Sequence, residues 1–354
     1  MNLARLGQLI RHTVLVIAFA SGLADEVVYA DQTWTIASDH PADTVAGRGV
    51  ESFATALARQ TGGALTGRIE SRDMAAATDL VAEVLGDSVQ VADVFAGTLA
   101  SFDPIFELPT LPFMVNSVEE SGRLACLAGP AYQRALSRAG LHLLFISPWP
   151  PTGLWTRQPV AAIGDIANLR VRTYDKSSAA VMRALGAHAT TLPIRDVEWQ
   201  LHVGGIDAVL SSGDGAVGRS LQADLSNFSA IYYAYPVSFV VMSQARYDVL
   251  PEKTRRELDE VAMNAGRAQW RSLPARIQAN YAEMQRAGVV VNSTFDAELN
   301  MRLHKAGEAR VREWLSRVSL GDAGIIKAFQ NREAPAAQDS CPLDLIEVGG
   351  TIRG

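Results

Sequence analysis

The chain has 354 residues, 48% of them hydrophobic, and a formal net charge of −6. That length accommodates about two domains of roughly 150 residues each. A mildly acidic chain without a basic cluster is not typical of proteins that bind nucleic acid or anionic lipid, so neither is expected as a partner. The six histidines are not spaced as metal ligands, and the Walker, G-x-G-x-x-G, H-E-x-x-H and G-x-S-x-G motifs are missing from the sequence. We therefore expect no metal, no cofactor and no enzymatic activity.

The start of the chain has the pattern of a secretory signal peptide. Arg5 and Arg11 supply positive charge, residues 13–23 are apolar, and small residues end at Ala30. The apolar stretch is too short to span a bilayer comfortably. We expect cleavage after Ala30 and export of the remaining chain, the alternative being an uncleaved membrane anchor.

Strands and helices are predicted to alternate through the first half. Apolar alternation or periodicity predicts strands over 34–38, 64–69, 89–95 and 141–145, and helices over 50–60, 78–85 and 118–140. Three prolines in the run 104–114 exclude a regular strand or helix there. A second proline cluster at 148–151, followed by Gly153, indicates a crossing between two domains.

The stretch 165–212 is predicted to form consecutive strand and helix units. Alternation in 169–173 predicts a half-buried strand with Arg170 and Arg172 on its polar face. A helix is expected from Ser177 or Ser178 to Leu185, a second helix over 196–203 and a buried strand over 206–210. An arginine then stands at a strand end, where open α/β sheets bind ligands.

The remaining chain is predicted to return to the first domain and then cross it again. The apolar run 231–241 should re-enter the first domain. A long helix is expected after Pro251, interrupted and kinked at Pro274. A strand over 289–291 and a helix over 295–318 should follow, and the tail after Leu320 should wrap irregularly.

Several segments, in order, carry a resemblance to a known family. They read TGG at 61–63, PIFELPTLPFM at 104–114, DIANLRVR at 165–172, ALGA at 184–187 and LPIRDVEWQLHVGGIDA at 192–208. This pattern resembles the solute-binding proteins of TRAP transporters, the tripartite ATP-independent periplasmic systems. Asn168, Glu198 and Ala208 depart from it, since the family usually has glycine, tyrosine and glycine there.

The resemblance implies a periplasmic binding-protein fold of two α/β domains, with a ligand cleft, hinge strands and a long helix that spans both domains. Domain I would comprise 31–148 and 236–275, and domain II 149–235 and 276–354. Such a protein, a monomer in the periplasm, would capture an organic acid and deliver it to the small and large membrane subunits. The alternatives are a ligand sensor that docks on a receptor and an exported enzyme.

The resemblance also implies a set of ligand-binding residues. Arg172 would hold the ligand carboxylate through two parallel bonds, or else form a structural ion pair. A second family arginine falls near Thr152, and Arg157 is either shifted into that place or a surface residue. The other candidates, each also open to a capping or packing role, are Asp39, Phe95, Ile194, Ser211, Tyr232 and Tyr235.

The chain has two cysteines, Cys126 and Cys341. Two thiols cannot build a disulfide framework or a four-cysteine metal site. In an oxidising compartment they either pair once, which would tie the tail to the body, or remain separate buried thiols.

Overall fold

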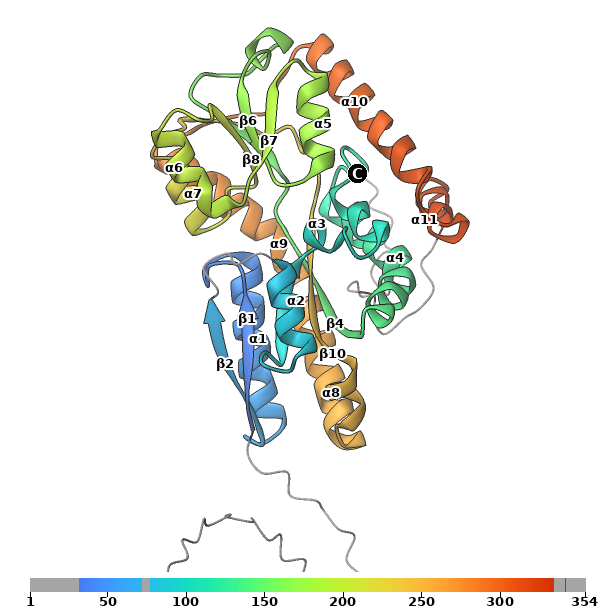
Figure 1. Ribbon diagram of the computed structural model, residues 1–354. Coiled ribbons are helices and arrows are strands. Elements are labelled where there is room, and N and C mark those ends of the chain that lie inside the picture. Colours follow the sequence, from blue (N-terminus) through green and yellow to red (C-terminus); the bar gives the residue numbers. More distant parts are fainter. Residues whose placement is uncertain (1–31, 72–76, 334–340, 342–354) are drawn as a thin grey trace, which may run out of the picture. The chain divides into compact units, whose positions relative to one another are not determined.

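The computed structural model of the protein describes residues 32–71, 77–333 and Cys341 (Figure 1). Among them, no helix combines the length and the hydropathy that a membrane span requires. Helices and strands alternate around two separate sheets, which we call sheet A and sheet B.

Sheet A has five strands in the order β2-β1-β3-β10-β4. Their bounds are β1 (Gln32–Ser38), β2 (Leu65–Ser71), β3 (Val91–Phe95), β4 (Leu141–Pro148) and β10 (Val237–Ser243). β1 pairs in parallel with β2 and β3, and β10 is antiparallel to β3 and β4. The return of the chain into the first sheet, predicted for 231–241, is confirmed for β10.

Sheet B has six strands in the order β11-β9-β5-β8-β6-β7. Their bounds are β5 (Gly153–Thr156), β6 (Arg170–Thr173), β7 (His188–Thr191), β8 (Ala208–Ser211), β9 (Asn227–Ser229) and β11 (Val290–Asn292). β6 lies between β7 and β8 and is parallel to both. β5, β7 and β9 were not predicted from the sequence.

The helices of the first half pack against sheet A. They are α1 (Val45–Gln60), α2 (Ala77–Leu85), α3 (Ala96–Leu99), the 3-10 helix η1 (Pro104–Thr110) and α4 (Val118–Arg138). α1 begins earlier than predicted because the Thr44 side chain accepts a hydrogen bond from the Gly47 amide, which caps the helix. The proline-rich run forms η1, in which Pro104 occupies the first turn.

Short helices connect the strands of sheet B and precede the long helix. They are η2 (Ile163–Asp165), α5 (Lys176–Ala184), η3 (Ile194–Asp196), α6 (Val197–His202), α7 (Ala216–Leu221) and α8 (Gln244–Val249). The N-cap of α5 is Asp175 rather than the predicted Ser177 or Ser178. The Asp175 side chain accepts from the Ser178 amide at 2.7 Å.

Helix α9 (Glu252–Arg286) is a single helix of 35 residues, so the predicted interruption at Pro274 is wrong. Proline removes one N–H donor, and the packing of the helical turn that precedes it offsets that loss. Trp270 and Leu273 are buried, and the Trp270 indole N–H donates to the Ile146 carbonyl at 3.1 Å. α9 packs against α1 and against β4 of sheet A, and it also packs against β11 of sheet B.

The last two helices contact different parts of the molecule. α10 (Ala297–Leu315) packs on α5, whereas α11 (Leu320–Gln330) packs on α4. The irregular wrap predicted after Leu320 is therefore wrong up to Gln330. Ser319 caps the N-terminus of α11. The apolar face of α11, formed by Ile325, Ile326 and Phe329, packs into the core around sheet A. Cys126 on α4 forms a disulfide with Cys341, which ties this end of the chain to the same region.

Two chain segments cross between the sheets side by side. The Trp149 amide donates to the Pro236 carbonyl, and the Thr152 amide to the Ala234 carbonyl, each at 2.9 Å. The Tyr233 amide returns a bond to the Thr152 carbonyl at the same distance. The proline cluster predicted as a crossing thus runs as one half of a paired connection.

Candidate functional site

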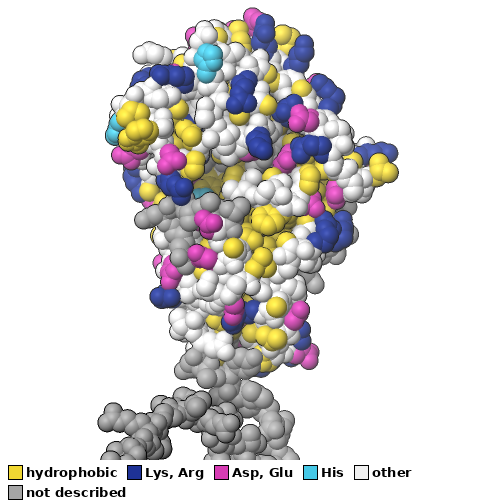
Figure 2. Space-filling view, viewed as in Figure 1, with side chains coloured by type: hydrophobic (Ala, Val, Ile, Leu, Met, Phe, Trp, Pro, Cys, Tyr) yellow, Lys and Arg dark blue, Asp and Glu magenta, His cyan; other side chains and the backbone are white. Residues whose placement is uncertain are grey.

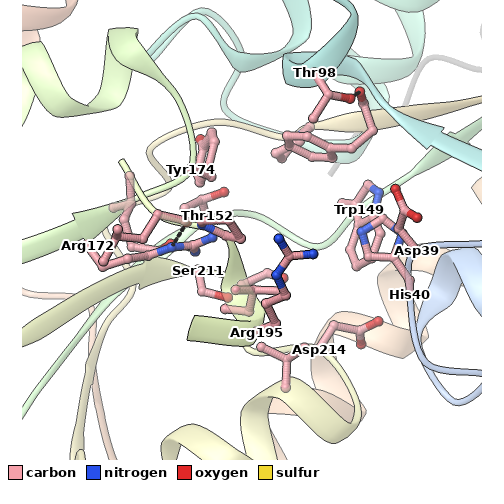
Figure 3. Close-up of a pocket in the computed structure, with 18 of the residues that line it drawn as sticks. Asp39, His40, Thr98, Trp149, Thr152, Arg172, Tyr174, Arg195, Ser211 and Asp214 are labelled. Atoms are coloured by element: carbon pink, nitrogen blue, oxygen red, sulfur yellow. Dashed lines mark hydrogen bonds between the residues drawn. The ribbon is translucent and has the colours of Figure 1, made fainter. Parts of the chain in front are cut away.

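A cavity of about 440 Å³ opens where the carboxyl ends of parallel strands from both sheets converge (Figure 3). β1 and β3 of sheet A and β6, β7 and β8 of sheet B all end at it. Ligands in α/β folds bind at such edges, and the volume suits a small molecule. Its lining from sheet A and the crossings is Asp39, His40, Phe95, Thr98, Trp149, Pro150, Thr152 and Pro236. Its lining from the sheet B side is Arg172, Tyr174, Thr191, Leu192, Pro193, Ile194, Arg195, Leu210, Ser211, Ser212, Asp214 and Val217.

Arg172 is buried in the wall formed by sheet B, with 5% of its surface exposed. Its Nε donates to the Leu192 carbonyl at 2.8 Å and its Nη1 to the Leu210 carbonyl at 3.3 Å. In the described part of the chain, no carboxylate forms an ion pair with it. Burial lowers the pKa of Arg172 to about 10, so the guanidinium stays protonated at neutral pH. A buried cation without an anion is costly, and an anionic ligand would compensate it.

Arg170 is in the opposite situation two residues earlier on the same strand. It is exposed, and it forms a two-bonded ion pair with Asp207, with Nε to Oδ2 at 2.7 Å and Nη2 to Oδ1 at 2.6 Å. These bonds from Arg170 lower the pKa of Asp207. The predicted half-buried strand is therefore wrong at Arg172, because β6 lies between β7 and β8 and the cavity wall covers that end of its polar face.

The wall formed by sheet A carries an acidic and an aromatic group. Asp39 follows β1 directly, is 9% exposed, and has an Oδ1 with no hydrogen-bond partner among the described residues. Burial raises the pKa of Asp39 to about 6. His40 packs against Trp149 with ring centroids 4.5 Å apart, and the Trp149 indole donates to Ser238 Oγ at 2.9 Å. Figure 3 shows Arg172 on one side of the cavity and Asp39, His40 and Trp149 on the other.

Aromatic rings from the two sheets meet at the margin of the cavity. Phe95, at the end of β3, and Tyr174, after β6, form an edge-to-face pair with centroids 5.8 Å apart. Arg195 projects from the segment after β7 into the space between Arg172 and Asp39, as Figure 3 shows. Its Nε lies 3.8 Å from Asp196 Oδ1, and its side chain is 44% exposed. The site thus offers two arginines, hydroxyl groups and a largely apolar lining.

The cavity contains six of the nine residues predicted from the sequence, namely Asp39, Phe95, Thr152, Arg172, Ile194 and Ser211. The lining residues that the sequence reasoning missed include His40, Trp149, Tyr174 and Arg195. His40 directly follows Asp39, a predicted site residue, and Tyr174 directly follows the predicted strand 169–173. Their position just after a strand end was therefore the signal that could have identified them as lining residues. Trp149 lies between two prolines and Arg195 lies in the short helix η3, and neither position gave such a signal.

The structure places Arg157 away from the cavity, which corrects its assignment as a site residue. β5 is antiparallel to β8, with Gly153 opposite Ser211 and Thr156 opposite Ala208. The residue after Thr156 therefore lies at the far edge of sheet B. There Arg157 Nη2 donates to the Leu201 carbonyl at 3.2 Å.

Tyr232 and Tyr235 do not line the cavity either. Tyr232 is 39% exposed and has a positive φ of 48°. Tyr235 packs into the core around sheet A, and its hydroxyl donates to the Asn116 carbonyl at 3.2 Å. Burial raises the pKa of Tyr235 to about 12. Both are packing or surface residues in this structure.

Charged groups connect the two sides at the rim of the cavity. Asp214, on the sheet B side, accepts from Arg276 Nε at 2.6 Å and from the amide of Val45, which starts α1, at 2.7 Å. Asp43, just before α1, pairs with Arg219 of α7 and accepts from the Ala216 amide at 3.2 Å. Asp214 is fully buried and Arg219 is half exposed, so the first connection is the stronger of the two.

Acidic and basic side chains are interspersed on the face drawn in Figure 2, without a large field of one sign. In the described ranges, no group of three or more His, Cys, Asp or Glu side chains is arranged to hold a metal ion.

Known proteins match this chain in sequence and in fold. The model of the family described as bacterial extracellular solute-binding protein, family 7, matches residues 36–315. A solute-binding protein of Chromohalobacter salexigens is 22% identical over 269 residues, which are 74% of this chain and 79% of the relative. The structure of DctP7, a Bordetella pertussis extracytoplasmic solute receptor binding pyroglutamic acid, is 26% identical with a TM-score of 0.79. That match covers 84% of this chain and 99% of the receptor. A TRAP periplasmic solute-binding protein from Chromohalobacter salexigens with bound D-glucuronate has a TM-score of 0.76 at 19% identity, over 85% of this chain and all of the other.

Proposed function

Because the chain belongs to the bacterial extracellular solute-binding proteins of family 7, we propose that it captures a small organic acid in its cavity and delivers the acid to the membrane subunits of a TRAP transporter. The family is one of solute-binding receptors and not of enzymes. The TRAP solute-binding fold expected from the sequence is confirmed. The single observation that carries the ligand class is Arg172, a buried guanidinium that faces the cavity without a carboxylate partner among the described residues.

Arg172 acts as the clamp for the ligand carboxylate. A guanidinium presents parallel N–H donors at the spacing of carboxylate oxygens, and Nε and Nη1 are already oriented by two backbone carbonyls. Thr152 and Ser211 supply hydroxyls to the rest of the ligand, and Phe95 and Ile194 supply apolar contact. The acids in the two solved relatives, pyroglutamate and D-glucuronate, are of a size that the cavity of about 440 Å³ admits.

Ligand binding closes two domains around the paired crossing. We assign 31–148 and 236–275 to the first domain and 149–235 and 276–315 to the second. α11 and Cys341 go to the first domain because they pack on or bond to α4. The short hydrogen-bonded segments around Thr152 and Ala234 form the hinge. Small-angle scattering with and without ligand tests the closure, and an unchanged radius of gyration contradicts it.

The protein acts in the periplasm after removal of a leader that ends at Ala30. β1 begins at Gln32, so cleavage there leaves sheet A intact. The disulfide between Cys126 and Cys341 is of the kind that persists in oxidising compartments. N-terminal sequencing of periplasmic material should begin at Asp31, and a start at Met1 on membrane-bound protein would contradict the assignment.

A thermal-shift screen against about a hundred carboxylates tests the function. A ligand at about 100 times its Kd adds about 2.7 kcal/mol to the free energy of unfolding, which raises the melting temperature measurably. The Arg172→Ala variant is screened in parallel. We expect one or a few acids to stabilise the wild type and none of these to stabilise the variant. Acids that stabilise both proteins equally would show that Arg172 is not the clamp.

A further inference from the structure

Asp39 is a buried carboxyl that lines the cavity and leaves one acceptor oxygen unused. It is 9% exposed, it lies on the sheet A wall opposite Arg172, and its Oδ1 has no hydrogen-bond partner among the described residues. A buried acceptor that stays unsatisfied costs about 1–3 kcal/mol, and more if it is charged. Proteins retain such a group at few places outside functional sites.

The carboxyl beside Asp39 differs because it does not line the cavity. Asp93 on β3 is fully buried, but its Oδ2 accepts from Ser38 Oγ at 3.2 Å and lies 3.4 Å from His40 Nδ1. Asp93 Oδ1, like Asp39 Oδ1, has no hydrogen-bond partner among the described residues. Of these two acids, only Asp39 lines the cavity, so only Asp39 is placed to meet a ligand.

The charged groups around Asp39 do not substitute for a hydrogen-bond donor. His40 and Arg195 favour its ionised form, whereas Asp93 and Glu83 oppose it, and burial exceeds each of these effects. The result is a pKa of Asp39 near 6, so the group is mostly ionised at neutral pH. An ionised carboxylate only accepts hydrogen bonds, and it repels a second anion that is brought beside it.

We propose that the ligand is a monocarboxylic acid with an N–H or O–H donor at the end away from its carboxylate, and that Asp39 accepts that donor and rejects dicarboxylates. This inference rests on the proposed capture of an organic acid by Arg172. The two walls of the cavity then recognise opposite ends of the same ligand molecule. Arg172 binds the anionic end, and Asp39 excludes any ligand that is anionic at both ends.

Three matched pairs of compounds test the proposal, by calorimetric titration at pH 7.5. They are succinamate against monomethyl succinate, 4-hydroxybutyrate against succinate, and D-glucuronate against D-glucarate. In each pair the first compound has a donor at the end away from its carboxylate, where the second has an ester or a second carboxylate. The first pair tests N–H donors and the other two test O–H donors.

We expect the donor-bearing member of every pair that binds to be preferred by the wild type by at least about tenfold. Asp39→Asn keeps the shape but offers a neutral amide, and it should reduce that preference to within about threefold. Asp79→Asn, an exposed carboxyl in the first turn of α2, is the matched control for loss of one charge and should leave the preference unchanged.

The outcomes separate this inference from the proposed function. If a dicarboxylate binds best and its binding requires Arg172, organic-acid capture stands and the role of Asp39 is overturned. If Asp39→Asn leaves the wild-type preference unchanged, the role of Asp39 is again overturned. If none of the six compounds binds, this inference falls, whereas organic-acid capture is judged by the wider carboxylate screen.

Discussion

The two walls of the cavity bury charged groups of opposite sign, and neither group is fully paired within the described chain. On the sheet B wall, Arg172 is bonded to two backbone carbonyls and to no carboxylate of the described chain. On the sheet A wall, Asp39 keeps one oxygen without a partner. At the rim, by contrast, Asp214 and Arg276 form an ion pair with each other. Buried charges are normally paired, so the contrast with the rim supports the proposal that a polar ligand pairs with Arg172 and with Asp39.

Removing the charge of the sheet B wall should have the largest effect. Hydrogen bonds to a charged group contribute about 1.5–3 kcal/mol each, so two of them amount to about two to four decades in Kd. We expect Arg172→Ala to lose that affinity in calorimetric titration with the acid found by the screen. Arg172→Lys keeps the charge but loses the paired donors, and it should lose at least about tenfold.

Arg170→Ala is the control for this prediction, because Arg170 lies on the same strand but pairs with Asp207 outside the cavity. Its Kd should stay within about twofold of the wild type, since an exposed ion pair contributes about 0–1 kcal/mol. Melting curves without ligand check the fold of each variant. An Arg172→Ala protein that binds normally, or that melts far earlier without ligand, would make Arg172 a structural residue.

Breaking the connection between the walls should lower stability rather than change selectivity. Asp214→Ala leaves Arg276 without its partner and the Val45 amide without an acceptor, and a broken buried pair costs about 3–5 kcal/mol of unfolding free energy. Arg219→Ala removes the half-exposed pair with Asp43 and should cost about 1 kcal/mol or less. Urea unfolding of the two variants measures the difference, and equal losses would refute the ranking of the two pairs.

In the absence of ligand, Asp39 on the sheet A wall should make the free energy of unfolding depend on pH. The pKa of Asp39 is raised from 3.8 to about 6, so the folded state holds this proton more tightly than the unfolded state. Its ionisation therefore destabilises the fold as pH rises from about 4 to 6, and the full cost is present above 6. Asp39→Asn carries no such cost. Its melting temperature should exceed that of the wild type at pH 7.5 and approach it at pH 4, whereas a constant difference would contradict the burial of Asp39.

Local patterns in the sequence predicted the strands that carry the site, but not the contacts that make it one. The alternation of 169–173 was enough to place Arg172 at a strand end, and the strand before Asp39 was equally clear. That Arg172 is buried depends on β7 and β8 beside it, and on the carbonyls of Leu192 and Leu210, which are distant in sequence. Arg157 was assigned by distance along the chain, and the antiparallel direction of β5 places it at the wrong edge.

Errors in the fold arose where tertiary packing outweighs local preference. Pro274 lies within one continuous α9 because the buried Trp270 and Leu273 anchor the helical turn that precedes it. α11 has only three apolar residues on its inner face, too few to give a clear period, and it is stabilised by α4. The pairing of Cys126 with Cys341 was left open because no local rule connects residues 215 positions apart.

The most direct test of the account changes the ligand and the protein together. The affinities of the identified acid and of its primary amide are measured by calorimetry for the wild type and for Arg172→Ala. If Arg172 clamps the carboxylate, replacing the acid by its amide weakens binding to the wild type by at least about a hundredfold, and to Arg172→Ala by no more than about threefold. Equal losses in the two proteins would show that the carboxylate is bound elsewhere, and the account of the cavity would be wrong.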